Sequence, residues 1–134
     1  MNVDYPKDIN KLFKYLQDEV SNNYLQIDRD SSKLKNILDR MFELNAFAIN
    51  IKEEDGGYNF NRIQKYFFFK SIATISSCLM LVQAQCQSSI SKIYNHSNYD
   101  FKKKWLKSAY QGRCKIGVAM SHLKILKPLV VGVE

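Results

Sequence analysis

Residues 61–94 read NRIQKYFFFKSIATISSCLMLVQAQCQSSISKIY, and this stretch decides the fold. Apolar side chains return in it every three or four residues, which is the spacing of an α-helix. One stripe of them consists of Phe68, Ile72, Ile75, Leu79, Val82 and Cys86. The pattern predicts one long helix over about 59–94. We expect any bend in this helix near Ser88 and Ser89, where two serines are adjacent.

A second apolar stripe follows the same predicted helix. At 100° per residue the two stripes lie about 145° apart, so the helix is apolar on two nearly opposite faces. The other helices of a monomer could cover both faces. Alternatively, the second face is a surface for self-association or for a partner protein. The residues that we predict at this interface are Tyr66, Phe69, Ala73, Met80 and Ala84.

Helical spacing also predicts helices over about 6–20, 33–51 and 99–126. Proline suits the first turn of a helix, as at the start of 6–20, and Pro128 would end the last one. The adjacent glycines Gly56 and Gly57 predict a tight reversal, because glycine readily adopts positive φ.

The fold class that we expect is all-α. Short connections favour antiparallel neighbours. The prediction is therefore an antiparallel four-helix bundle whose long central pair covers 59–94 and 99–126. With 134 residues, residues 1–134 should form a single domain. The chain has only 5 Gly and 2 Pro, too few for the many tight turns of a sandwich or barrel.

Charge is divided unevenly along the chain. Residues 1–55 carry eight basic and eleven acidic side chains, whereas residues 56–134 carry twelve basic and two acidic ones. The whole chain has a formal net charge of +7. A basic half of this kind indicates an anionic partner, or else a solvated face that balances the acidic half.

Lysines gather on the predicted helix over 99–126, and three basic side chains repeat there every eleven residues, or three helical turns. Distributed, flexible cations suit the phosphates of a nucleic-acid backbone, and lysine contacts phosphate without reading bases. We therefore predict a nucleic-acid-binding accessory protein of a ribonucleoprotein complex. The predicted contact residues are Arg62, Lys65, Lys102, Lys103, Lys104, Lys107, Arg113, Lys115, Lys124 and Lys127.

A protein-binding module is the alternative interpretation. An immunity protein, inhibitor or adaptor could use the basic half against an acidic protein partner and bind no nucleic acid. In this case the apolar stripe would supply the strongest contacts of the interface.

Enzymatic motifs are missing from the sequence. It has no glycine-rich phosphate loop and no Gly-x-Ser-x-Gly, and His96 and His122 are far apart. The acidic pairs lack the spacing of metal ligands. We therefore expect no catalytic residue, no metal and no cofactor, and a protein that is not an enzyme.

The location that we expect is the cytoplasm, without a membrane span. The apolar stretch over 66–83 is interrupted by Lys70 and several hydroxyl side chains, so it falls short of a transmembrane helix. Cys78 and Cys86 are too far apart along one helix for a disulfide, which favours reduced cysteines.

Overall fold

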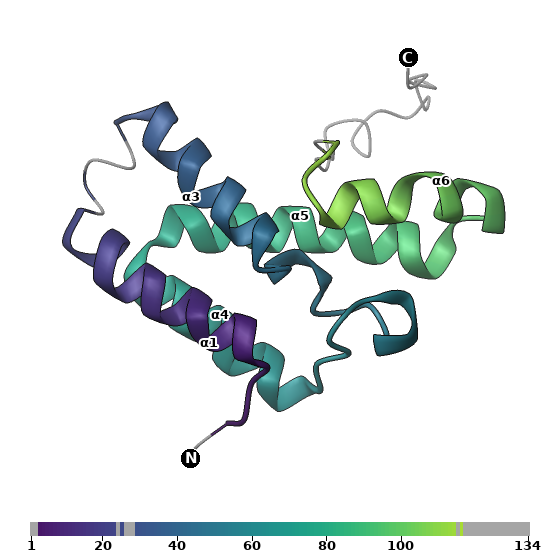
Figure 1. The fold of residues 1–134 in the computed structure, drawn as a ribbon, viewed down its shortest axis with the longest axis horizontal. Helices are drawn as coiled ribbons and strands as arrows, with labels where there is room; N and C mark the ends of the chain where they lie inside the picture. Colours follow the sequence, from purple (N-terminus) through teal and green to yellow (C-terminus); the bar gives the residue numbers. More distant parts are fainter. Residues whose placement is uncertain (1–2, 24, 26–28, 115, 117–134) are drawn as a thin grey trace, which may run out of the picture.

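In a computed structural model, the structure describes residues 3–23, 25, 29–114 and 116. Within these residues every regular element is helical, so the all-α class is confirmed (Figure 1). The α-helices are α1 (Lys7–Tyr15), α3 (Ser31–Glu43), α4 (Arg62–Ile75), α5 (Ser77–His96) and α6 (Tyr99–Tyr110). Shorter helical turns are the π-helical Leu16–Val20 and the 3-10 turns Ser21–Asn23 (η2), Ala46–Ala48 (η3) and Glu53–Asp55 (η4).

Side chains cap the starts of several helices. Asp30 caps α3, and Asn98 caps α6 by accepting a hydrogen bond of 2.9 Å from a backbone N–H. At the start of α4, Asn61 and Gln64 each accept a bond of 2.9 Å from the backbone N–H of the other. Such caps satisfy the first N–H groups of a helix, which have no partner within it.

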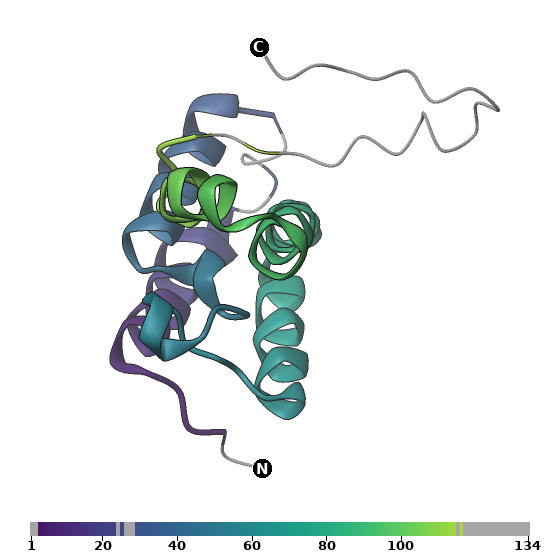
Figure 2. The same cartoon turned by 90° about the vertical axis from the view of Figure 1, so that its right-hand side faces the viewer.

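The expected long helix over 59–94 is two helices, because the chain breaks at Ser76. This residue is extended (φ −154°, ψ 120°), and its hydroxyl accepts a 3.2 Å bond from the backbone N–H of Leu79, so it caps α5. Figures 1 and 2 show α5 leaving α4 at a steep angle. Ser89, where a bend was expected, stays helical, and its hydroxyl donates to the Gln85 carbonyl at 3.2 Å.

The predicted helix over 33–51 also ends early. Asn45 takes a left-handed conformation (φ 57°), which asparagine tolerates better than most residues. The chain then enters η3, and residues 46–49 are fully buried.

The predicted helix over 99–126 ends within its described part at Tyr110. Gly112 has φ +72°, so this residue, expected in a helical seam, stands just beyond a helix end instead. The continuation of this predicted helix over 117–126 lies outside the described residues.

Aromatic rings form the core between α1 and α4; α1 lies in front of α4 in Figure 1, and rings of the two helices are in contact. Phe68 is fully buried, and its ring centroid lies 5.8 Å from that of Phe13 and 6.0 Å from that of Phe60. The hydroxyl of Tyr5 donates to the Gln64 carbonyl at 2.8 Å and joins the chain before α1 to α4.

The loop of residues 46–60, which its own backbone hydrogen bonds hold in a compact form, is the second part of the core. Its backbone closes on itself: Asn59 donates to the Ile51 carbonyl and Phe60 to the Ile49 carbonyl, both at 2.8 Å. The Gln83 side chain on α5 donates to the Ala46 carbonyl at 2.8 Å. The loop is therefore fixed against α5, and it carries η4 toward α6.

None of the described helices has the length and apolar character needed to span a bilayer. Cys78, Cys86 and Cys114 are free thiols.

Candidate functional site

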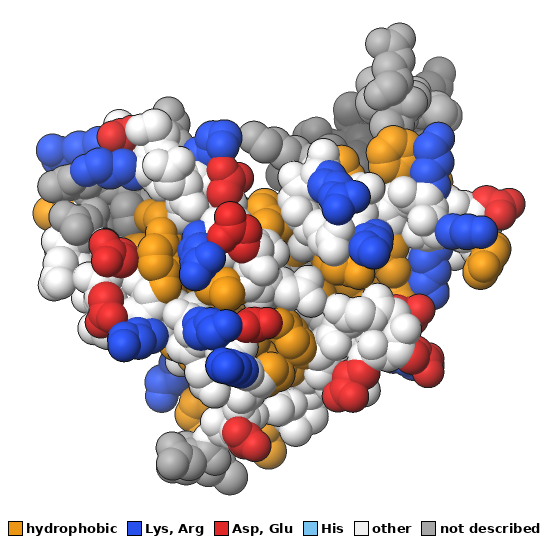
Figure 3. Space-filling view, viewed as in Figure 1, with side chains coloured by type: hydrophobic (Ala, Val, Ile, Leu, Met, Phe, Trp, Pro, Cys, Tyr) orange, Lys and Arg blue, Asp and Glu red, His pale blue; other side chains and the backbone are white. Residues whose placement is uncertain are grey.

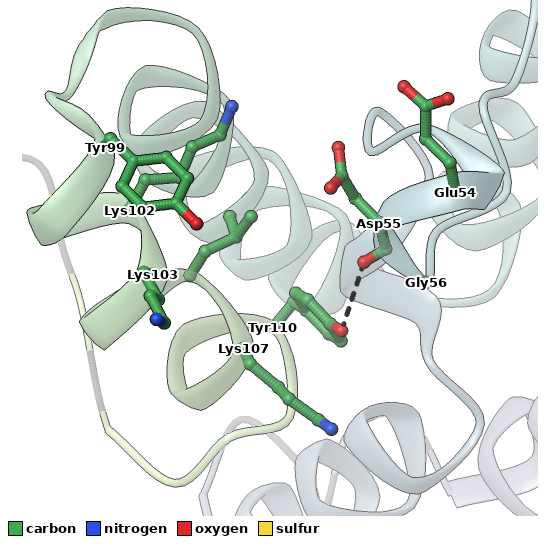
Figure 4. A pocket seen from close by; sticks show the side chains of 9 residues that line it. Glu54, Asp55, Gly56, Tyr99, Lys102, Lys103, Lys107 and Tyr110 are labelled. Carbon is green, nitrogen blue, oxygen red and sulfur yellow. Dashed lines mark hydrogen bonds between the residues drawn. The ribbon is translucent and has the colours of Figure 1, made fainter.

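A hollow lies between α6 and η4, and we call it the α6–η4 cleft. Its volume is about 500 Å³. Figure 4 shows lysine and tyrosine side chains of α6 on one wall and the carboxylates of the loop on the other. The lining residues are Glu54, Asp55, Gly56, Tyr99, Lys102, Lys103, Leu106, Lys107 and Tyr110.

Helical periodicity places the α6 wall. Tyr99, Lys103, Leu106 and Tyr110 are separated by four, three and four residues, so they share one face of the helix. Leu106 and Tyr110 are buried and form the base of the cleft, whereas the lysines reach outward. Figure 3 shows lysine side chains over α6 and acidic side chains over the 53–55 turn, with hydrophobic side chains between them.

Hydrogen bonds hold the loop wall of the cleft. Tyr94 on α5 donates to a carboxylate oxygen of Asp55 at 2.6 Å, and Tyr110 donates to the Asp55 carbonyl at 3.4 Å. Gly56 has φ +87°, and a Cβ there would lie 3.0 Å from the Tyr110 hydroxyl. The loop thus approaches α6 closely at a residue that must be small.

Both tyrosines remain hydrogen-bond donors at neutral pH. Burial raises the pKa of Tyr110, and the Asp55 carboxylate raises it further. Burial also raises the pKa of Tyr94, as does its hydrogen bond to Asp55. The two phenols therefore stay protonated and keep η4 attached to α5 and α6.

The two walls of the cleft carry opposite charges, with lysines on α6 and carboxylates on the loop. Within the described part of the chain, Lys103 and Lys107 form no ion pair, while Lys102 lies over the Tyr94 ring at 4.3 Å. On the other wall, Glu54 pairs with Lys52 at 3.2 Å. The α6 wall can therefore bind an anion, and the loop wall can accept hydrogen bonds from hydroxyl or amino groups.

A second hollow is apolar, and we call it the α3–α5 groove. It holds about 320 Å³. Leu34, Leu38 and Phe42 lie one helical turn apart on α3 and form one side, and Cys86 of α5 lies opposite. Burial raises the pKa of the Cys86 thiol, so it stays neutral. The full lining is Leu34, Lys35, Leu38, Asp39, Phe42, Cys86, Gly112, Cys114 and Ile116.

A third hollow of about 460 Å³ joins this groove, because the two share Asp39, Phe42 and Gly112. Gln111 also lines the third hollow, and its side-chain oxygen is buried without a hydrogen-bond partner. Tyr110, the preceding residue, lines the α6–η4 cleft. Three consecutive residues, 110–112, therefore line the three hollows at the C-terminal end of α6.

A comparison with family models decides the affiliation. The model described as acyl-CoA dehydrogenase, N-terminal domain, matches residues 10–113. The chain belongs to this family. The matched range contains most of α1 and all of α3, α4, α5 and α6. No curated protein and no solved structure matches the chain.

This acyl-CoA dehydrogenase affiliation corrects the functional expectations from the sequence. The expected nucleic-acid-binding ribonucleoprotein subunit is wrong, and the expected non-enzyme is wrong, because the family is one of enzymes. The protein-binding module that stood as the alternative is overturned by the same match. The charge pattern by itself did not indicate this enzyme family.

The predicted basic residues are dispersed in this dehydrogenase-family domain. Lys102, Lys103 and Lys107 meet at the α6–η4 cleft, whereas Lys104 lies over the Trp105 ring at 5.0 Å. Arg113 follows the end of α6 and lines the third hollow, so it does not continue a helical stripe from Lys102. Arg62 and Lys65 lie on α4, apart from α6 (Figure 1). Lys115, Lys124 and Lys127 are outside the described residues.

The predicted interface residues lie on α4 and α5 and differ in exposure. Tyr66 is 63% exposed and Ala73 is also exposed. Phe69 and Met80 are partly buried and pack on the core, and Ala84 is intermediate. In the opposite stripe Phe68, Ile72 and Leu79 are buried as expected, whereas Ile75, Val82 and Cys86 are only partly buried. On α5 the polar side chains of Gln83 and Gln87 are buried instead.

Sequence reasoning missed the loop wall of the cleft and the whole α3–α5 groove. The signal for the groove was present: Leu34, Leu38 and Phe42 recur every four residues beside the buried stripe of α3. Among the residues that the structure describes, no group of histidine, cysteine and acidic side chains could hold a metal ion.

Proposed function

We propose that the chain works as the helical N-terminal domain of an acyl-CoA dehydrogenase and binds an acyl-CoA thioester. The family match over 10–113 carries this proposal. An acyl-CoA has an anionic nucleotide end, a polar middle and an apolar acyl chain. The cleft has lysines on one wall, the third hollow has mainly polar side chains, and the groove is apolar. Each part of an acyl-CoA therefore has a lining of matching chemistry, which supports the proposal.

The acyl chain is assigned to the α3–α5 groove. Leu34, Leu38 and Phe42 present hydrocarbon and an aromatic ring to it, and ligand pockets are typically lined in this way. The charged residues of its rim, Lys35 and Asp39, pair with each other at 2.5 Å. The groove therefore offers little to a charged ligand and favours an alkyl chain.

Oxidation of a thioester needs a hydride acceptor, and flavins and nicotinamides perform this chemistry in proteins. The described residues do not fit such a ring system. Hydride transfer needs a site closed to water, whereas Tyr99, the aromatic ring at the mouth of the α6–η4 cleft, is 74% exposed, and the α3–α5 groove is lined mainly by hydrocarbon. We therefore assign the described residues to substrate binding and derive no catalytic step from them.

A cytoplasmic location is part of the proposal. The three free thiols support it, because reducing compartments keep cysteines unpaired.

Binding of acyl-CoA can be measured by isothermal titration of the full chain with thioesters of increasing acyl length. We expect affinity to rise by up to about fourfold for each added methylene that enters the groove, because burying one methylene contributes about 0.8 kcal/mol. In Leu38→Gln this rise should flatten, whereas Leu81→Gln, on an exposed part of α5, should retain it. Equal affinity for CoA and for every acyl-CoA would contradict the proposed function.

Self-association through the predicted interface of Tyr66, Phe69, Ala73, Met80 and Ala84 stays a prediction. Tyr66 and Ile63 are both more than half exposed on α4. Sedimentation at tens of micromolar should give a mass above 15.7 kDa that Tyr66→Glu returns to the monomer value. A wild-type chain that remains a monomer over that range would remove the prediction.

A further inference from the structure

We infer that the α6–η4 cleft binds the phosphate-bearing nucleotide end of CoA, with Lys103 and Lys107 contacting phosphate and Tyr99 contacting the base. This inference rests on the proposed function, because it names the part of the ligand that the cleft takes. It assigns the cleft to a single nucleotide within a thioester ligand.

The first argument is charge. Lys103 and Lys107 are separated by four residues on one helix face, so their ammonium groups repel each other. Both side chains are exposed, and the described carboxylates do not pair with them. A phosphate between them removes the repulsion and gains charge-assisted hydrogen bonds. Lys102 adds a third positive charge, and its ammonium group lies over the Tyr94 ring at 4.3 Å.

The second argument is the exposed aromatic ring at the mouth. Tyr99 is 74% exposed, and Figure 4 shows its ring beside the lysines of the same wall. This ring stacks on no other ring of the described residues, and a ring next to cations suits a purine base, because bases stack on aromatic side chains while their phosphates contact lysine.

The third argument is the opposite wall. Glu54 and Asp55 repel phosphate but accept hydrogen bonds from ribose hydroxyls or from an exocyclic amine. Each carboxylate has two oxygens, so the bonds to Lys52 and Tyr94 leave further acceptor capacity. The two walls therefore orient a nucleotide, with its phosphates at α6 and its sugar at the loop.

The fourth argument is position. The cleft volume of about 500 Å³ is within the usual range for small-ligand sites. Its wall ends at Tyr110, Gln111 lines the third hollow, and Gly112 lines both the third hollow and the groove. Residues that line the three hollows therefore lie next to one another at 110–112, as a single ligand that reaches from the cleft to the groove requires.

The test uses the full chain and three probes: CoA, adenosine 3′,5′-bisphosphate, and an acyl-pantetheine, which lacks the nucleotide. In Lys103→Glu/Lys107→Glu, affinity for CoA and for the bisphosphate should fall at least tenfold, while acyl-pantetheine binds as in the wild type. The matched control is Lys7→Glu/Lys14→Glu, which changes the net charge equally on α1 and should alter each affinity less than twofold. Circular dichroism checks that both variants remain helical.

A second variant tests the aromatic contact. Tyr99→Ala should weaken the bisphosphate several-fold, and Tyr99→Phe should retain its affinity, because stacking needs the ring and not the hydroxyl.

The outcomes separate the inference from the proposed function. CoA that binds the cleft variant as tightly as the wild type would overturn the inference, and a retained preference for acyl-CoA over CoA would leave the proposed function standing. An acyl-CoA that gains nothing over CoA would overturn the proposed function. A bisphosphate affinity that still depends on Lys103 and Lys107 would then support the nucleotide site.

Discussion

Gly57→Ala should destabilise the protein by about 3 kcal/mol, near the upper end of what overpacking usually costs. A Cβ at this position would lie 2.6 Å from the Ala48 carbonyl oxygen and closer still to that of Ile51. Both are backbone atoms of a buried segment, so neither can rotate away as the tip of a side chain would. Urea unfolding followed by circular dichroism measures the loss.

Gly56→Ala is the matched control. It requires a positive φ and a Cβ 3.0 Å from the Tyr110 hydroxyl, but that contact is the tip of a side chain. Its cost should be about 1–2 kcal/mol, which is the usual penalty for a left-handed residue with a Cβ. A greater loss in Gly56→Ala than in Gly57→Ala would contradict the close packing of the loop.

The starts of the helices could be predicted from sequence because caps are local. Asn61 with Gln64, and Asp30 before two serines, are recognisable pairs within four residues. Pro6 stands immediately before α1. The reversal at Gly56 and Gly57 was equally local.

The ends of the helices were harder to predict from sequence, because several similar residues could each take the non-helical conformation that ends a helix. Ser76 and Ser89 have the same side chain, but Ser76 caps a new helix while Ser89 donates back to the preceding turn. Asn45 and Gly112 follow helix ends and have positive φ, and the spacing of apolar residues does not predict where such a conformation occurs. The choice between these conformations is made by packing of distant segments.

Only the α6 wall of the candidate site could be predicted from sequence, because its residues are close together along the chain. Lys103 and Lys107 are four residues apart, so sequence alone places them together on α6. Glu54 and Asp55 are about fifty residues away along the chain and reach the cleft only because the loop folds onto α5. Charge alone therefore indicated an anion-binding face without its second wall, and the nucleic-acid partner inferred from it is contradicted by the family match.

Phe68→Ala should destabilise the protein by about 3–5 kcal/mol, the usual range for removal of a buried phenylalanine side chain. The ring is fully buried and has neighbours on three segments: Phe13 on α1, Phe60 before α4, and Phe69 beside it on α4. Phe13 and Phe60 belong to other segments than Phe68, so they cannot fill the cavity without shifting α1 and the chain before α4 relative to α4. The matched control is Tyr66→Ala, two residues earlier on the same helix, where the ring is 63% exposed and truncation should change stability by no more than about 0.5 kcal/mol. Urea unfolding at two protein concentrations makes the comparison, because a Tyr66→Ala effect that grows with concentration would place this residue in a contact between copies of the chain. Equal losses in the two variants at low concentration would contradict the assignment of the Phe68 stripe to the core and the Tyr66 stripe to the surface.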